Sequence, residues 1–227
     1  MKHTLKLWEK MVALADNIWW TRKARIQTEK RLLSNAFQSQ LILLWYSFFS
    51  VAVSIYYLKN PQNGNEAISW IVYSVLVLCI SGFINGLSFK ERASLVKECY
   101  ESLNSLIHES SSPNPDIAKL AATYESKLNA CENHTDKDFA IALCQEYWAS
   151  TESVRQLSKT FHSDISENKT QPKLALTRIP TSHHWFLAAS YFANRFVTLI
   201  FFYALPVLIW CLLRSSVFVT NSASAGG

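Results

Sequence analysis

Histidine, cysteine and carboxylate side chains gather at a few places in this chain where they could bind a ligand or catalyse a reaction. His183 and His184 stand beside Trp185, and imidazoles in such a pair could hold a metal or a lipid phosphate. Adjacent side chains point in different directions on a helix, so we interpret the pair as polar residues near a membrane. The five cysteines show no CxxC motif and no zinc spacing, which predicts free thiols in a reducing compartment.

A second polar cluster consists of Glu132, Asn133, His134 and Asp136, at the junction of two expected helices. Capping and turn chemistry explains such a cluster, and the alternative is a contact with a regulatory ligand or partner. The sequence contains no GxGxxG, P-loop, GxSxG or HExxH motif. We therefore expect no catalytic residue, no cofactor and no metal site, and we predict that the protein is not an enzyme.

Two long apolar runs lie close together in the first half of the chain, and they determine which polar residues lie outside the membrane. Residues 41–58 and 67–89 contain no charged side chain, and only eight residues separate them. A run of about 18 or more such residues crosses the hydrocarbon core of a bilayer as a helix. The pair therefore predicts a transmembrane hairpin, with a lipid bilayer as the first partner of the protein.

The distribution of charge predicts the orientation of this hairpin. Residues 1–40 carry eight Lys and Arg residues against three acidic ones, and Lys90, Arg92 and Lys97 follow the second span closely. Short flanks rich in Lys and Arg stay in the cytoplasm, so we place the N-terminus and residues 90–184 there. Because the basic segment leads directly into a span and the remaining soluble part is slightly acidic, we expect no direct contact with nucleic acid.

The segment before the first span has apolar side chains at helical spacing and no Gly or Pro, which predicts a long basic amphipathic helix. Tryptophans beside basic residues suit an interfacial position, with the rings in the headgroup layer and the cations on anionic lipid. The alternative is that the apolar stripe packs on the cytoplasmic helices, and the two arrangements are compatible. The expected interfacial anchors, including the two arginines that bracket the last apolar run, are Trp19, Trp20, Arg22, Lys23, Arg25, Arg195 and Arg214.

Small and polar residues mark one face of each span. The serines of the first span recur at i, i+3 and i+7, and the second span ends in a GxxxG sequence that lets helix backbones approach closely. We interpret this face as a packing surface or a pore lining, and the alternative for a serine is a hydroxyl bonded to its own i−4 carbonyl. The residues concerned are Ser47, Ser50, Ser54, Ser74, Ser81, Gly82, Asn85 and Gly86.

Amphipathic helices are expected after the hairpin. An apolar stripe over residues 95–107 extends the second span, and Asp116 is placed to cap the next helix. Thr135 and Asp138 resemble a capping box at the start of a third helix that runs to about residue 161. We expect these helices to form a cytoplasmic bundle with the N-terminal helix.

The last apolar run, residues 196–213, has no charged residue and is long enough for a third span. Pro206 and the short length also fit a kinked, re-entrant or interfacial helix. The predicted fold is therefore an all-α membrane protein. Its expected parts are the basic helix 1–40, the hairpin 41–89, the cytoplasmic helical region 90–162, a linker 163–184, the hydrophobic helix 185–221, and a disordered tail or cloning remnant 222–227.

Four stretches placed around the hairpin are typical of one protein family. They are the run TRKARIQTEKRL over residues 21–32, the WYS at 45–47, the KER at 90–92 with KECY at 97–100, and Tyr124 followed by ENHTD at 132–136. In this order the sequence resembles the SLATT family, two-transmembrane effector domains associated with nucleotidyltransferases (SMODS) and nucleotide-sensing SLOG domains. The third apolar run departs from the two spans of that name, and no fused sensor domain is recognisable.

The resemblance implies an effector of bacterial anti-phage defence. Such a protein would form a homo-oligomer in the inner membrane and open a pore or disrupt the bilayer, causing cell arrest or death. Its trigger would come from a separately encoded sensor or signal-producing protein: a nucleotidyltransferase, a SLOG protein or a reverse transcriptase. The alternative is a non-conducting membrane anchor that recruits a partner defence enzyme to the bilayer.

Overall fold

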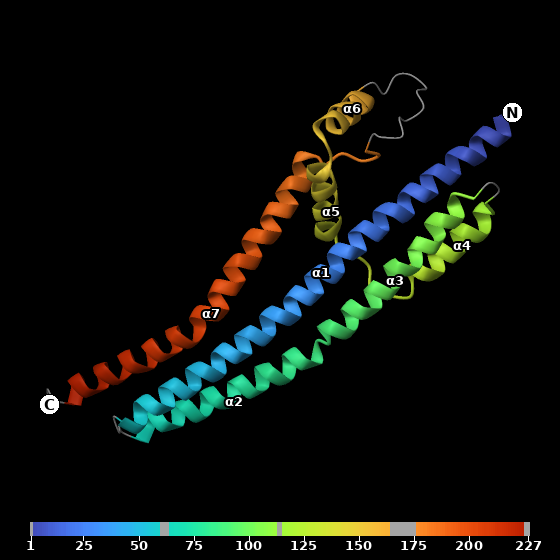
Figure 1. The fold of residues 1–227 in the computed structure, drawn as a ribbon. Helices are drawn as coiled ribbons and strands as arrows, with labels where there is room; N and C mark the ends of the chain where they lie inside the picture. Colours follow the sequence, from blue (N-terminus) through green and yellow to red (C-terminus); the bar gives the residue numbers. More distant parts are fainter. Residues whose placement is uncertain (1, 60–63, 113–114, 164–175, 225–227) are drawn as a thin grey trace. The chain divides into compact units, whose positions relative to one another are not determined.

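The computed structural model describes residues 2–59, 64–112, 115–163 and 176–224. Those residues form helices and connecting segments and contain no strand, which confirms the predicted all-α class. Three helical stretches, Lys10–Tyr57, Trp70–Ser110 and Ser182–Cys211, are long and apolar enough to cross a membrane. The helices are α1 (Lys2–Lys59), α2 (Gly64–Gly86), α3 (Phe89–Ser110), α4 (Ile117–Leu128), α5 (Asp136–Ala149), α6 (Glu152–Ser163) and α7 (Ser182–Ser224) (Figure 1).

Helix α1 runs without a break through the basic arm and the first apolar run. No Gly or Pro occurs anywhere in its 58 residues, so nothing in the sequence interrupts the backbone hydrogen bonds. The expected boundary at residue 40 is therefore not a break in the helix. Within one continuous helix, the side chains change there from mixed polar and apolar to almost entirely apolar.

The second span does not continue directly into the next helix, as the apolar stripe had suggested. Helix α2 ends at Gly86 and α3 begins at Phe89, with Ser88 at a φ of 45° between them. The amide of Leu87 donates to the Ile84 carbonyl at 3.2 Å, a tightened last turn that ends the helix. Glycine is a poor helix former, and a left-handed residue just after it is the usual way to stop a helix.

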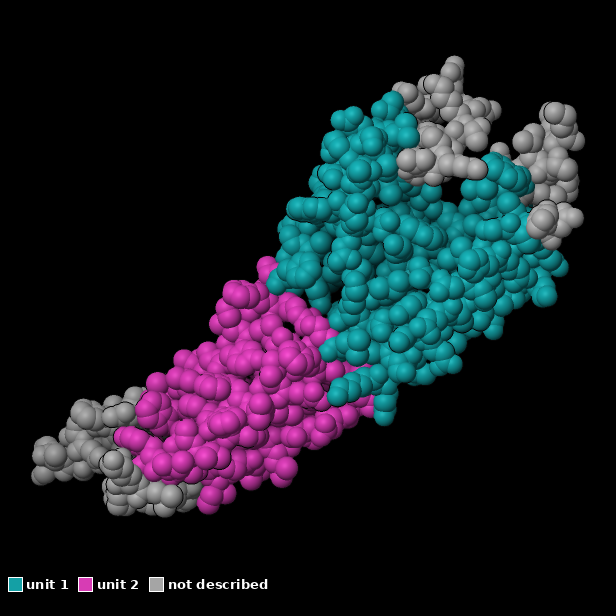
Figure 2. All heavy atoms as spheres, viewed as in Figure 1, with its two compact units in different colours: residues 1–33, 90–192 teal, residues 34–89, 193–227 magenta. Residues whose placement is uncertain are grey.

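The chain divides into two compact units (Figure 2). Unit 1 contains residues 1–33 and 90–192, so the start of α1 packs with helices that follow the hairpin. One part of its core joins Ile18 of α1 to Leu103 and Leu106 of α3 and to Leu120 of α4, all of them almost completely buried. These contacts build the predicted helical bundle with the N-terminal arm as a member.

Local capping signals within unit 1 are confirmed. The Asp116 carboxylate accepts hydrogen bonds from the amides of Ala118 and Lys119, both at 3.1 Å, at the start of α4. Thr135 and Asp138 form the predicted capping box at the start of α5. The single helix expected from 135 to about 161 is wrong, because Ser150 adopts an extended conformation with ψ at 148° and separates α5 from α6. Serine bonds readily to nearby backbone and favours helix ends over helix interiors.

The linker expected over 163–184 lies partly outside the described residues, and its described end belongs to unit 1 and packs on the start of α1. Arg178 forms an ion pair with Asp16 at 3.1 Å and lies over the ring of Trp20, 5.9 Å from its centroid. Helix α7 then begins at Ser182, three residues before the expected boundary.

Unit 2 contains residues 34–89 and 193–227, that is, the end of α1, all of α2 and the second part of α7. Within it α1 and α2 run antiparallel (Figure 1), with contacts such as the Tyr46 and Tyr73 rings at 6.5 Å. Many large apolar side chains point outward, among them Leu78 at 72% and Phe83 at 69% exposure. Such exposure suits a hydrocarbon environment, in which apolar surface need not be hidden from water.

Candidate functional site

The serines of the spans use their hydroxyls within their own helices. Ser47 donates to the Leu43 carbonyl at 2.9 Å, Ser54 to the Ser50 carbonyl at 2.8 Å, and Ser74 to the Trp70 carbonyl at 2.9 Å. This is the i−4 bond of the alternative considered for these residues. Ser50 and Ser81 are half-buried, whereas the other three serines are exposed on the surface of unit 2.

The GxxxG sequence of α2 faces away from α1. Gly82 follows the buried Tyr73 by nine residues, which at about 100° per residue is half a turn beyond two full turns. A side-chain carbon placed on Gly82 or Gly86 would meet no described atom within 4 Å, and Asn85 beside them is exposed. No described part of this chain therefore packs on the glycine face.

Three of the five expected interfacial anchors of α1, namely Trp20, Lys23 and Arg25, contact parts of unit 1 that follow the hairpin. Trp20 is 1% exposed and donates its indole hydrogen to Thr177 at 2.7 Å, while Lys23 forms an ion pair with Glu146 at 2.8 Å. Trp19 stacks edge-on against Trp20, and Arg22 is half-buried. These placements favour the alternative in which the arm packs on the helices that follow the hairpin.

Arg25 lies at the centre of this packing, with none of its surface exposed. Its guanidinium donates to the Leu128 carbonyl at 3.1 Å and, at 3.5 Å, to the Lys127 carbonyl and the Asn133 side chain. The last carbonyls of a helix carry partial negative charge, so a cation at the end of α4 is stabilised there. Arg25 thus holds α1 against the end of α4 and the loop that follows.

The remaining two anchors lie on α7. Arg195 donates to the Ser34 hydroxyl at 2.6 Å and to the Asn35 side chain at 3.1 Å, within unit 2. The side chain of Arg214 lies outside the described residues.

The expected regulatory cluster supports the same bundle. Glu132 accepts a hydrogen bond from Arg92 of α3 at 2.8 Å, and Asn133 contacts Arg25 as described. Burial, followed by the nearby charge of Arg25, lowers the pKa of His134 below its ordinary value. Asp136 lies exposed in the first turn of α5, where an acid complements the helix dipole.

Asp138 has a second role that the capping pattern does not reveal. Its carboxylate, 1% exposed, accepts two hydrogen bonds from Arg31 of α1, both at 3.0 Å, and one from the Thr28 hydroxyl at 3.1 Å. The capping bonds of Thr135 complete the shell, at 3.0 Å from its amide and 2.9 Å from its hydroxyl. Burial alone would raise the pKa of Asp138, but the bonds from Arg31 and Thr135 outweigh it and lower that pKa.

The histidine pair also has a structural role. The Nδ1 of His184 accepts a hydrogen bond from the Thr181 amide at 3.1 Å, which satisfies a backbone donor at the start of α7. Among the residues that the structure describes, no group of three or more His, Cys, Asp or Glu side chains could hold a metal ion. The described cysteines are free thiols.

Residues 8–213 match the family model described as SMODS and SLOG-associating 2TM effector domain family 5. The chain belongs to this SLATT family. No curated protein and no solved structure matches it. A SLATT domain is a membrane effector of bacterial conflict systems associated with SMODS and SLOG proteins, and its family is an effector family rather than a catalytic one.

This SLATT chain has a third apolar helix beyond the two of the family name, and α7 is tied to α1 at its proline. Pro206 has no amide hydrogen, so the Phe202 carbonyl four residues earlier has no donor within the helix. The Tyr46 hydroxyl donates to that carbonyl at 2.9 Å, and the Trp45 indole donates to the Tyr203 carbonyl at 3.0 Å. Sequence reasoning noticed Pro206 but had no means of pairing it with Tyr46.

Proposed function

We propose that this SLATT protein is an effector of bacterial anti-phage defence that forms a homo-oligomer in the inner membrane and permeabilises it. The observation that carries the proposal is the glycine face of α2, which points away from α1 and has no described neighbour. Helices associate in membranes through small residues, because close backbone contact replaces the hydrophobic effect there. A second copy of the chain is the partner that such a face fits best.

The composition of unit 1 supports the proposed orientation. Residues 1–33 and 90–192 pack together, which supports a hairpin whose two ends share one side of the bilayer. The excess of Lys and Arg in residues 1–40 favours the cytoplasm as that side. A third span through α7 would then put the C-terminus on the opposite side.

The buried polar contacts of unit 1 suggest how the effector is kept inactive. Arg25 and Arg31 of α1 are held by the end of α4 and by Asp138 of α5, which fixes one arrangement of these helices. A partner that binds another arrangement more tightly would shift the population toward it. We propose that a separately encoded nucleotidyltransferase, SLOG protein or reverse transcriptase supplies this signal.

A membrane-potential measurement tests the proposal. In bacteria that express the full chain from an inducible promoter, a potentiometric dye should report depolarisation, and the variant Gly82→Leu/Gly86→Leu should abolish it. Ala52→Leu is the matched control, because Ala52 is an exposed position of the first span and lies outside the glycine face. If both variants depolarise the cells as the parent does, the glycine face has no role in permeabilisation.

The second candidate function is a non-conducting anchor for a partner enzyme. The back-bonded hydroxyls of Ser47, Ser54 and Ser74 favour it, because they need no aqueous path to be satisfied. Replacement of Ser47, Ser50 and Ser54 by Leu separates the two candidates. An anchor should keep its partner recruitment in this variant, whereas an effector that conducts along the serine face should lose depolarisation.

A further inference from the structure

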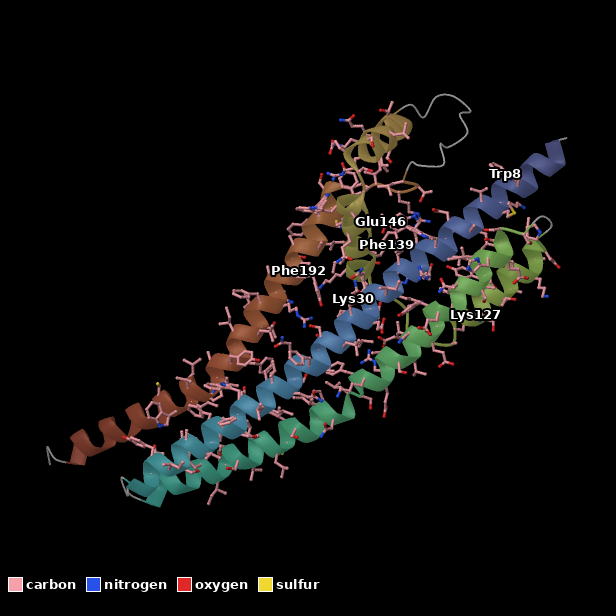
Figure 3. The ribbon with its side chains drawn as sticks, viewed as in Figure 1. Trp8, Lys30, Lys127, Phe139, Glu146 and Phe192 are labelled. Atoms are coloured by element: carbon pink, nitrogen blue, oxygen red, sulfur yellow. The ribbon has the colours of Figure 1, made fainter. Side chains whose placement is uncertain are left out.

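Two cysteines of unit 1 lie next to each other. Cys99 of α3 is 5% exposed, and Cys131 is half-buried in the loop 129–135 between α4 and α5. The Cys131 thiol donates a hydrogen bond to the Cys99 sulfur, and the Cys99 thiol donates to the Lys127 carbonyl at 3.1 Å. Figure 3 labels Lys127, which lies near the end of α4. Sulfurs in such contact need only a small movement to reach the bonding distance of a disulfide.

A buried cation lies beside this pair. Arg25 of α1 directs its guanidinium at the Cys99 sulfur, and its other described partners are the Lys127 and Leu128 carbonyls and the Asn133 side chain. None of these partners carries a full negative charge, and the Nε of Arg25 is buried without a described hydrogen-bond partner. A buried cation is costly unless a negative group pairs with it. A thiolate at Cys99 would supply that negative charge.

Loss of the Cys99 proton leaves no backbone group unsatisfied. The thiolate would keep the hydrogen bond from Arg25, and Arg25 also donates to the Lys127 carbonyl at 3.5 Å, so this carbonyl retains a donor. The thiolate is the form of cysteine that attacks oxidants, and a neighbouring arginine favours it. Cys99 is therefore the sulfur of the pair that is suited to act as the nucleophile.

Cys131 is suited to a second step, in which a protonated thiol closes the bond. Burial, followed by the hydrogen bond with Cys99, raises the pKa of Cys131 to about 12, so this thiol stays protonated at neutral pH. Cys131 lies in a loop, whose backbone adjusts more easily than that of a helix. Because its side chain is partly exposed, a small oxidant can reach the pair from solvent.

We propose that Cys99 and Cys131 form a reversible disulfide when hydrogen peroxide reaches them. The Cys99 thiolate attacks one peroxide oxygen, the O–O bond breaks, and the departing hydroxide takes up a proton to become water. The Cys131 sulfur then attacks the sulfenic acid of Cys99, the S–O bond breaks, and the departing hydroxide leaves as water with the Cys131 proton. The two thiols lose two electrons and two protons in total, and the peroxide is reduced to two waters. Small thiols reverse the reaction by exchange.

The disulfide would join α3 covalently to the loop after α4, beside the carbonyls that hold Arg25. Because the bond closes a loop of about 30 residues, the oxidised protein should have a melting temperature about 5 °C higher than the reduced one. This modification site does not depend on permeabilisation, since it needs only the folded unit 1 and an oxidant.

Peptide mapping of the full-length protein tests the proposal. The protein in detergent is treated with a small excess of hydrogen peroxide, unfolded, blocked with N-ethylmaleimide and digested with trypsin without reductant. Trypsin gives the peptide 98–119 with Cys99 as its single cysteine and the peptide 128–137 with Cys131 as its single cysteine. Mass spectrometry should find the two peptides linked and lighter than their sum by two hydrogens, and dithiothreitol should separate them. On a non-reducing gel the oxidised protein should run as a monomer.

The variant Cys131→Ser should lose both the linked peptides and the rise in melting temperature. Cys144→Ser is the matched control, because Cys144 is as buried as Cys99, at 6% exposure, and packs in a core cluster with Ile141 and Ala188. It should keep both effects. If Cys131→Ser does not fold, the parent melted with and without dithiothreitol after oxidation supplies the same comparison. Complete alkylation of Cys99 and Cys131 after peroxide treatment, a covalent dimer that contains the linked peptides, or an equal rise in melting temperature in Cys131→Ser would overturn the proposal.

Discussion

The Tyr46 hydroxyl should stabilise the protein only because residue 206 is a proline. Tyr46 is 1% exposed, and its hydroxyl is donated to the carbonyl that Pro206 leaves without a helical donor. No water reaches a carbonyl in the hydrocarbon core, so each unsatisfied group there is costly. Tyr46→Phe keeps the ring and removes this donor.

The expected cost follows from the two possible states of the Phe202 carbonyl. Hydrogen bonds between membrane helices contribute about 0.6 kcal/mol on average and about 1.7 at most, because an unpaired group usually finds another partner. Pro206 removes the nearest alternative partner, so we expect Tyr46→Phe to cost about 1.5 kcal/mol. In a Pro206→Ala background the amide of residue 206 can donate to Phe202, and the cost should fall to about 0.5 kcal/mol or less.

The assay is a double-mutant cycle on the free energy of unfolding, measured by steric trapping in bicelles for the parent, the two single variants and the double variant. The coupling should be about 1 kcal/mol. Tyr203→Phe is the control, because the Tyr203 hydroxyl makes only a long 3.5 Å contact with Gln38. An equal cost of Tyr46→Phe in both backgrounds would refute the reasoning, since the bond would then owe nothing to the missing amide.

Three further predictions concern unit 1 and its junction with the second span. Asp138→Asn should destabilise the protein by about 3 kcal/mol at pH 7, because it removes the buried charge that pairs with the half-buried Arg31, and chemical unfolding of the two proteins measures this. The lowered pKa of Asp138 means that its contribution is complete above about pH 4 and is lost as the pH falls through the folded-state pKa, so the variant should show a flatter stability profile in acid. His134 has a lowered pKa as well, so stability should decrease as the pH falls below about 6.5, and His134→Gln should remove that decrease in thermal melts from pH 7 to 5. Ser88→Gly should raise stability by about 0.5 kcal/mol and Ser88→Val should lower it, because Ser88 has a φ of 45°; equal melting temperatures would show that this conformation is not strained.

The parts of this fold that could be predicted from sequence depend on signals within a short stretch. An uncharged run such as residues 41–58 crosses a bilayer whatever else the chain does, and Thr135 caps the helix that starts next to it. Pro206 also predicts that the carbonyl four residues earlier lacks a donor within its own helix. Each of these statements needs only neighbours in sequence.

The surroundings of the basic N-terminal part of α1 could not be predicted, because the same residue pattern fits both a lipid headgroup layer and a protein interior. Tryptophans and arginines on one helix suit a lipid headgroup layer, and they suit equally a protein interior that offers helix carbonyls, as α4 offers them to Arg25. Likewise, Arg31 and Asp138 are 107 residues apart, and the sequence around either residue does not predict their ion pair. The end of α5 at Ser150 was missed because a serine interrupts some helices and is tolerated in others.

During synthesis, the N-terminal part of α1 leaves the ribosome long before the residues that it packs against. Trp20 of α1 donates to Thr177, which is made 157 residues later. At about 5 to 20 residues per second, the two emerge about 8 to 30 s apart. During that interval the helix has apolar and basic residues but none of its protein partners, and the bilayer beside the emerging hairpin is the surface that suits it. We therefore expect the nascent arm to contact lipid first and to leave it when residues 90–192 are complete, with insertion of the hairpin before the folding of unit 1.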